Sequence, residues 1–125
     1  DDKSETAREK GAELIARTVN GWDPKIPVII TGDFNSYIQE SAGRVLTTQG
    51  QMKDAFREAA EKINDHLGTF HNYVNVQTGG GIQKRIDYIF FRGNISVKKS
   101  EIVTFHINEQ YPSDHFPVTA DLVLH

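Results

Sequence analysis

Polar residues that can do chemistry occur at three places where the surrounding sequence is strongly apolar. Each set follows, interrupts or precedes an apolar run, and the sets are Asp33 with Asn35, Asp87, and Asp114 with His115. Carboxylate and amide oxygens are hard ligands, so together they would suit Mg²⁺, Mn²⁺ or Ca²⁺ better than zinc. A histidine oriented by an aspartate can exchange protons near neutral pH. If the three sets meet, the residues favour metal-assisted attack of water on a phosphate ester.

Each set also has an ordinary structural interpretation. Asp33 and Asn35 are common turn residues at the end of a strand. Asp87 would be costly to bury inside a strand unless it is paired, but on an edge strand it would simply face water. The chemical interpretation therefore requires the three strands to be neighbours in space.

The segment 27–35 is the one around which we expect the chain to be organised. Its run Pro-Val-Ile-Ile-Thr is typical of a strand buried on both faces, over 27–31, and Gly32 would allow a tight turn at its end. Residues two apart on a strand point the same way, so Asp33 and Asn35 would face one spot while Phe34 packs away from it. Open α/β sheets bind ligands at such strand ends.

The remaining pattern predicts alternating helices and strands in one domain. Helical spacing and capping residues favour helices, and alternating or continuous apolar runs favour strands. We expect helices at 4–20, 40–47 and 54–64, strands at 27–31, 85–91, 95–105 and 117–124, and irregular chain at 65–84.

Composition limits the function classes. The chain has 125 residues, a net charge of −3, a pI near 5.9 and no cysteine. The acidic balance argues against an unaided nucleic-acid binder, although a bound cation would change the local charge. Thiolate metal sites and disulfides are excluded, and no apolar run reaches the length of a membrane span. The chain does not begin with Met, so we expect it to be part of a longer protein.

Other polar residues of the loops have weaker signals. The triplet Gly79–Gly81 matches no phosphate-binding loop and is expected to be a flexible turn. His66 and His71 lie in polar sequence typical of surface histidines. Lys84 and Arg85 could approach a phosphate, but solvated side chains are the simpler expectation.

Three sequence blocks together resemble the endonuclease/exonuclease/phosphatase superfamily. The blocks are Gly32-Asp33-Phe34-Asn35, Arg85-Ile86-Asp87-Tyr88-Ile89-Phe90, and Ser113-Asp114-His115-Phe116-Pro117-Val118. Each block alone is weak, but their order and distances make the resemblance specific, and it covers nearly the whole chain. Among branches, the sequence looks most like bacterial metal-dependent hydrolases related to deadenylases and exodeoxyribonucleases.

The resemblance implies a role for each site residue. Asp33 would position or deprotonate the attacking water, and Asn35 would hold the water or the phosphate. Asp33 and Asp114 would hold the metal, Mg²⁺ or Mn²⁺ with Ca²⁺ as a further option. His115 would contact the scissile phosphate, and Asp87 would orient its ring. The implied activity is hydrolysis of a phosphoester, in particular a phosphodiester.

The resemblance also implies that residues 1–125 are only the carboxyl-terminal half of the family domain. That domain is a four-layer α/β/β/α sandwich of roughly twice this length, larger than an ordinary single domain. We therefore expect an α/β fold with a mixed, largely antiparallel sheet covered by helices on one face. The amino-terminal half would supply an essential metal-binding glutamate, which Glu40, Glu101 and Glu109 do not replace. The chain alone is expected to be inactive.

The open face of such a half would expose apolar surface, and this predicts a partner. The partner is either the missing amino-terminal half or a second copy of the chain. The substrate is expected to be a phosphate ester, with a nucleic acid, a nucleotide, a phospholipid and a sugar phosphate all left open. The alternatives to an enzyme are a non-catalytic interaction domain on the same scaffold and a nucleic-acid-binding module without chemistry. Nothing in the sequence fixes the localisation.

Overall fold

The computed structural model describes residues 2–125, with side chains described from residue 4 onward. It contains two three-stranded sheets, in the orders β1-β4-β2 and β3-β5-β6. The elements in chain order are α1 (Asp2–Asn20), β1 (Val28–Asp33), α2 (Ser41–Thr48), β2 (Lys53–Asp54), α3 (Ala55–Glu58), β3 (Glu61–Ile63), the 3₁₀ helix η1 (Ile82–Lys84), β4 (Asp87–Arg92), β5 (Ile95–Ile102) and β6 (Val118–Leu124).

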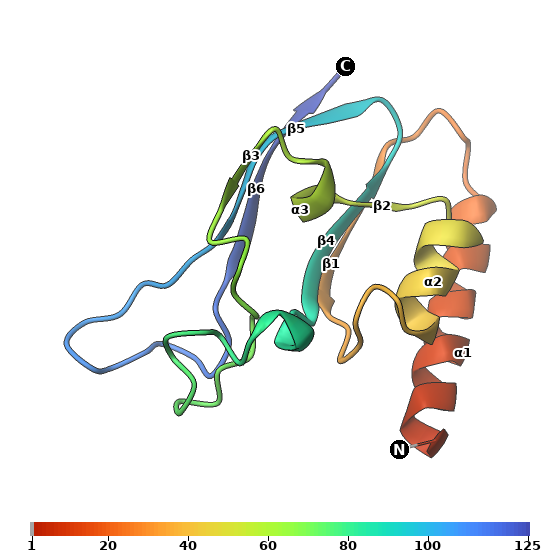
Figure 1. Cartoon of the computed structure of the whole chain (residues 1–125). Coiled ribbons are helices and arrows are strands. Elements are labelled where there is room, and N and C mark those ends of the chain that lie inside the picture. Colours follow the sequence, from red (N-terminus) through yellow and green to blue (C-terminus); the bar gives the residue numbers. More distant parts are fainter. Residues whose placement is uncertain (1) are drawn as a thin grey trace.

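Helices α1 and α2 cover one face of the first sheet, and the second sheet lies on its other face (Figure 1). Alternation along β4 explains this layering, because successive side chains of a strand point to opposite faces. Tyr88 and Phe90 pack with buried residues of α1 and α2, including Ala16 and Leu46. Phe91, on the opposite face, belongs to the core shared with the second sheet. One helical layer and two sheet layers are thus visible in this chain.

The core between the sheets is formed by residues from both of them. Ile89 and Phe91 of β4 pack with Val97 of β5 and Leu122 of β6. Burying these aliphatic and aromatic side chains stabilises the sheet pair by roughly 1.5–3 kcal/mol for each fully buried residue. The two sheets therefore form one packed unit rather than separate subdomains.

The mixed α/β class and the largely antiparallel pairing are confirmed. Strands β1 and β4, β2 and β4, and β5 and β6 pair antiparallel, and only β3 and β5 pair parallel. The expectation of a single sheet with one open face was wrong. The turn after β4 carries the chain into the second sheet, so the inner face of the first sheet is already covered by β5 and β6.

Helices α1 and α2 match the predicted segments 4–20 and 40–47 closely, but the predicted helix at 54–64 was wrong. Only four residues, Ala55–Glu58, are helical, and Ala59 has an extended ψ of 135°. Ala60 donates its N–H to the carbonyl of Val97, and β3 then pairs with β5. Sheet hydrogen bonds, which are non-local, override the helical spacing of the apolar residues.

Strand β1 lies at the edge of its sheet, which corrects the prediction that it is buried on both faces. Val28 is buried, whereas Ile29 is 46% exposed. The strand also continues through Gly32 to Asp33, so Gly32 pairs with Tyr88 and does not form the predicted turn. No helix in the described residues has the length and apolar character needed to cross a bilayer.

Candidate active site

Strands β1 and β4 bring Asp33 and Asp87 together. The two strands pair antiparallel, and Asp33 at the end of β1 stands opposite Asp87 at the start of β4. A cavity of about 370 Å³ opens here, lined by residues that include Asp33, Asp87 and Val118 of β6. Two carboxylates from separate sequence blocks therefore face one space between the sheets.

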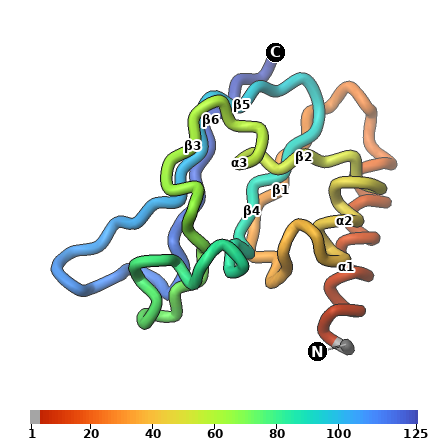
Figure 2. The backbone as a smooth tube through the Cα atoms, in the orientation of Figure 1, coloured from red at the N-terminus to blue at the C-terminus, as the bar shows by residue number. Residues whose placement is uncertain are grey.

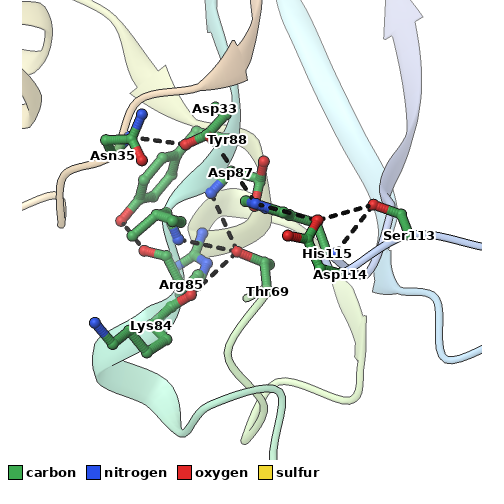
Figure 3. A network of polar contacts seen from close by, with 11 residues as sticks. Asp33, Asn35, Thr69, Lys84, Arg85, Asp87, Tyr88, Ser113, Asp114 and His115 are labelled. Atoms are coloured by element: carbon green, nitrogen blue, oxygen red, sulfur yellow. Dashed lines mark hydrogen bonds and ion pairs between the residues drawn. The ribbon is translucent and has the colours of Figure 1, made fainter. Parts of the chain in front are cut away.

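His115 reaches this point from the second sheet, just before β6. Its Nδ1 lies 2.7 Å from Oδ2 of Asp87. Its Nε2 lies 3.8 Å from Oδ2 of Asp33 and 3.9 Å from Oδ1 of Asp114 (Figure 3). Three carboxylates thus surround one imidazole, as the sequence analysis required.

The protonation of His115 follows from this arrangement. Because an ionised carboxylate can only accept, Nδ1 carries the hydrogen and donates it to Asp87. Burial by itself lowers the pKa of His115, but the hydrogen bond to Asp87 and the negative charges of Asp87, Asp33 and Asp114 outweigh it and raise that pKa. The raised pKa extends the pH range over which the ring stays protonated and can donate from Nε2 to a phosphate oxygen.

Asn35 lies beside Asp33 on the other side of the site (Figure 3). It adopts a left-handed backbone conformation with φ 48°, and its N–H donates to Oδ1 of Asp33 at 2.9 Å. Asparagine tolerates this conformation better than most residues. The hydrogen bond fixes the Asp33 carboxylate relative to the loop that follows β1.

The carboxylates fit a cation. Asp33, Asp87 and His115 each offer a ligand atom, and these atoms lie within 4.8 Å of one another. Asp114, expected as a metal ligand with Asp33, is outside this group but borders it through His115. Among the residues whose side chains the structure describes, no lysine or arginine forms an ion pair with Asp33, Asp87 or Asp114. The three carboxylates are thus hard, acidic donors without a lysine or arginine partner among the described residues, which suits a divalent metal of the Mg²⁺ type.

Arg85 does not have the solvated side chain that the sequence suggested. Its Nη2 lies 2.5 Å from Oδ2 of Asp54, which is almost fully buried. Its guanidinium also lies between the rings of Phe56 and Tyr88, at 4.8 and 5.0 Å from their centroids. Lys84 is exposed, as expected. Arg85 therefore anchors the start of β4 instead of reaching for a phosphate.

The glycine triplet lies in a turn, as expected, and its backbone packs closely against Gly68. Gly79 is buried, and a Cβ added to it would lie 2.1 Å from the carbonyl oxygen of Gly68. A Cβ on Gly68 would lie 2.0 Å from the carbonyl oxygen of Gly81. Two backbone segments therefore touch directly at these positions, next to Thr69.

His71 is buried, although it was expected at the surface, while His66 is exposed as expected. Nδ1 of His71 accepts the N–H of Tyr73 at 3.0 Å, and its ring centroid lies 4.6 Å from that of Phe116. Burial lowers the pKa of His71. Its backbone N–H donates to the carbonyl of Asp114 at 3.0 Å, so the main chain at His71 anchors the loop that carries Asp114.

Sequence reasoning missed two residues that hold the site in place. Thr69 bonds the backbone at Asp87, and Asp54 pairs with Arg85. Asp54 sits in a predicted helix and Thr69 in a polar loop, so neither stood out locally. An acid at the start of a helical pattern could have been recognised as an N-cap, which is what Asp54 is for α3.

Comparisons with known proteins identify the family to which this fold belongs. A profile of the Endonuclease/Exonuclease/phosphatase family matches residues 6–115. A protein of that family from Bacteroides vulgatus superposes with a TM-score of 0.82 at 34% identity, covering 97% of this chain and 45% of that one. The mannosyl-6-phosphatase of Bacteroides thetaiotaomicron gives a TM-score of 0.80 at 28% identity, covering 95% and 46%.

A curated protein of Caenorhabditis elegans, itself uncharacterized, is 27% identical, over 77% of this chain and 40% of its own length. The chain thus spans less than half the length of these relatives. The family profile covers most of the residues, and the structural neighbours share both sheets and helices. On these grounds the chain belongs to the endonuclease/exonuclease/phosphatase family.

Proposed function

We propose that the protein containing this chain is a divalent-metal-dependent phosphoester hydrolase, acting on phosphodiesters by attack of water on phosphorus. The observation that carries the proposal is the meeting of Asp33, Asp87 and Asp114 around the His115 ring, with Asp87 and His115 2.7 Å apart, beside a cavity that Asp33 and Asp87 line. Family membership supports hydrolase chemistry in general. The named mannosyl-6-phosphatase shows that a structural neighbour acts on a sugar phosphate.

Each side chain has a separate task in this proposal. Asp33 accepts the proton of the attacking water, and Asn35 holds that water or a phosphate oxygen. Asp87 fixes the ring of His115 through Nδ1, which leaves Nε2 to donate to the phosphate as negative charge develops. Asp33 and Asp114 would hold Mg²⁺ or Mn²⁺, and a bound metal would neutralise phosphate charge and lower the pKa of water.

The isolated chain is proposed to be nearly inactive. It covers less than half of its relatives, and the family resemblance assigns an essential metal-binding glutamate to the other half. Losing part of a metal site removes one of the largest contributions to rate.

The test measures hydrolysis of a generic phosphodiester, a phosphomonoester, an oligonucleotide and a sugar phosphate with Mg²⁺ or Mn²⁺. It compares the complete protein, this chain alone, and the complete protein carrying Asp33→Ala. Asp121→Ala, at an exposed position of β6, is the matched control. We expect activity in the complete protein and the control, and a loss of at least about 100-fold in Asp33→Ala. Undiminished activity in Asp33→Ala would remove this mechanism.

We further propose that the open edge of β1 packs on the remainder of the family fold. Between α1 and β1 a groove of about 520 Å³ is lined mainly by apolar side chains, and three of its lining residues are markedly exposed: Leu14 58%, Trp22 48% and Ile29 46%. The relatives contain more than twice the chain seen here, so the remainder of the fold is the occupant that their length supports. An exposed edge strand beside apolar surface otherwise promotes association.

Light scattering after size exclusion tests this surface. We expect the chain alone to self-associate and the charged variant Ile29→Lys to be monomeric. Co-expression with the remaining half should give a one-to-one complex in place of self-association. A stable monomer that does not bind the other half would contradict the proposal. A dimer that persists when the other half is present would identify self-association as the function of this surface.

A further inference from the structure

Thr69 lies between the start of β4, which carries Asp87, and the segment before β6, which carries His115. It is fully buried, in the loop between β3 and η1. Its hydroxyl accepts the N–H groups of Ile86 and Asp87, at 3.0 and 3.2 Å, and donates to the carbonyl of Lys84 at 3.2 Å. A hydroxyl has one hydrogen and two lone pairs, so all its hydrogen-bonding capacity is used.

The backbone of the same residue binds the segment that carries His115. The carbonyl of Thr69 accepts the N–H of Phe116 at 2.8 Å. The next residue, Phe70, forms an isolated bridge with His115, and their ring centroids lie 5.0 Å apart. Thr69 therefore contacts both Asp87 at the start of β4 and Phe116, the immediate neighbour of His115, in the segment that leads into β6 (Figure 3).

Within residues 2–125, no strand offers acceptors to the N–H groups of Ile86 and Asp87 on the β2 side of β4. Strand β2 pairs only with Phe90 and Phe91, so it does not extend to the start of β4. Without the hydroxyl of Thr69, the buried N–H of Ile86 and the partly buried N–H of Asp87 would lose their acceptor, and proteins strongly avoid leaving buried N–H groups unpaired.

Backbone hydrogen bonds of Thr69 and of the preceding Gly68 also fix the position of Thr69. Its own N–H donates to the carbonyl of Lys84 at 2.9 Å. The preceding Gly68 packs against the backbone of the glycine triplet, with its N–H bonded to the carbonyl of Thr78 at 3.0 Å. The tube in Figure 2 shows this loop beside the segment that leads into β6. The loop has little freedom to relax around a changed residue 69.

We propose that Thr69 is a positioning residue whose hydroxyl sets the hydrogen bond between Asp87 and His115. This role rests on the proposed function, because it acts through a pair that the proposed mechanism uses. Thr69 itself touches neither substrate nor metal. Serine should replace it, since serine keeps the hydroxyl, and valine should not, although valine has nearly the same shape.

The test compares Thr69→Val with Thr69→Ser, and with Thr78→Val as a matched control. Thr78 lies in the same loop but is exposed, and its hydroxyl makes only one long bond of 3.5 Å. The first readout is the ring ¹⁵N spectrum of His115 in alkaline solution, which reports whether Nδ1 or Nε2 carries the proton of the neutral ring. The second readout is kcat in the complete protein.

We expect wild type, Thr69→Ser and Thr78→Val to hold the proton on Nδ1. Thr69→Val should give a mixture of the two tautomers and a kcat lower by about 10- to 100-fold, because displaced catalytic groups lose rate steeply. A folded Thr69→Val protein with the wild-type ring spectrum and kcat would overturn the proposal.

If Thr69→Val does not fold, the ring spectrum of Thr69→Ser tests the role of the hydroxyl. Retention of the Nδ1 proton in Thr69→Ser supports the role of the hydroxyl, and its loss in a folded protein overturns it. If the complete wild-type protein hydrolyses no phosphoester, the proposed function fails, while the ring spectra still test Thr69 independently.

Discussion

Asp87 and His115 are 28 positions apart, one at the start of β4 and the other in the segment before β6, yet Oδ2 of Asp87 lies 2.7 Å from Nδ1 of His115. This hydrogen bond joins the start of β4 to the entry of β6. The hydrogen bond occupies Nδ1, so the other ring nitrogen, Nε2, is the one that can contact a substrate. Nε2 is directed toward Asp33 and Asp114. Much of the proposed mechanism depends on this one contact.

Asp87→Asn should lower the pKa of His115 and the rate together. The amide removes the negative charge and the charged acceptor that now raise that pKa, while burial continues to lower it. We expect kcat in the complete protein to fall by about 100-fold. An NMR titration of His115 and steady-state kinetics measure the two effects, with Asp121→Asn as control. An unchanged His115 titration would show that Asp87 does not control the ring.

Asp33→Asn should weaken binding of Mn²⁺ to this chain by about tenfold or more, because hard cations respond strongly to the number of carboxylate ligands. Asp33 belongs to the group of ligand atoms that lie within 4.8 Å of one another. The enhancement of water proton relaxation by Mn²⁺ gives the dissociation constant. Asp114→Asn tests the second proposed ligand in the same assay. Equal affinities for wild type and Asp33→Asn would exclude Asp33 as a ligand.

Asp54→Ala should destabilise the fold by about 3 kcal/mol, because it leaves the partly buried Arg85 guanidinium without its partner. It also removes the acceptor for the N–H of Phe56 at the start of α3. Urea unfolding measures the change. In contrast, Glu13→Ala breaks a surface pair between the half-buried Glu13 and the exposed Lys10, and should cost less than about 1 kcal/mol. Equal costs for the two variants would mean that the Asp54–Arg85 pair has no special role.

Gly68→Ala should destabilise the protein strongly, whereas Gly11→Ala should stabilise it. A Cβ on Gly68 would lie 2.0 Å from the carbonyl oxygen of Gly81, but one on Gly11 in α1 meets nothing within 4 Å. Alanine in an open helical position gains about 0.5–1 kcal/mol over glycine. Thermal unfolding of both variants separates the two effects. A Gly68→Ala protein as stable as wild type would show that the two backbone segments can move apart.

Glu5 should make the stability of the protein depend on pH in the acid range. Hydrogen bonds from the hydroxyl of Ser41 and from Arg8 lower the pKa of Glu5 from 4.5 to about 2. Since the folded state favours the carboxylate, this contribution is present above pH 4.5 and is lost as the pH falls toward about 2. Glu5→Gln should therefore flatten the pH dependence of the unfolding free energy across that interval. Glu109→Gln, in an exposed loop, is the control. Identical slopes for wild type and Glu5→Gln would contradict the link between Glu5 and α2.

The sequence determined the three motif blocks, the long first helix and the strands that carry the site. These features depend on local spacing: alternation assigns the two faces of β4, and helical spacing of the apolar residues predicts α1. The types of the residues Asp33, Asp87 and His115 were therefore enough to suggest the chemistry. They were also enough to indicate the family, which the profile match then established.

Only the tertiary structure decided how these elements combine. The segment 54–64 has helical spacing, but its second half forms β3, which pairs with β5. After the turn that follows β4, strand β5 belongs to the second sheet and not to the first. Arg85 is internal because Asp54 is buried beside it, and Thr69 matters because β2 is too short to cover the start of β4. Such outcomes depend on contacts between residues far apart in the chain, and those contacts leave no periodic signal in the local sequence.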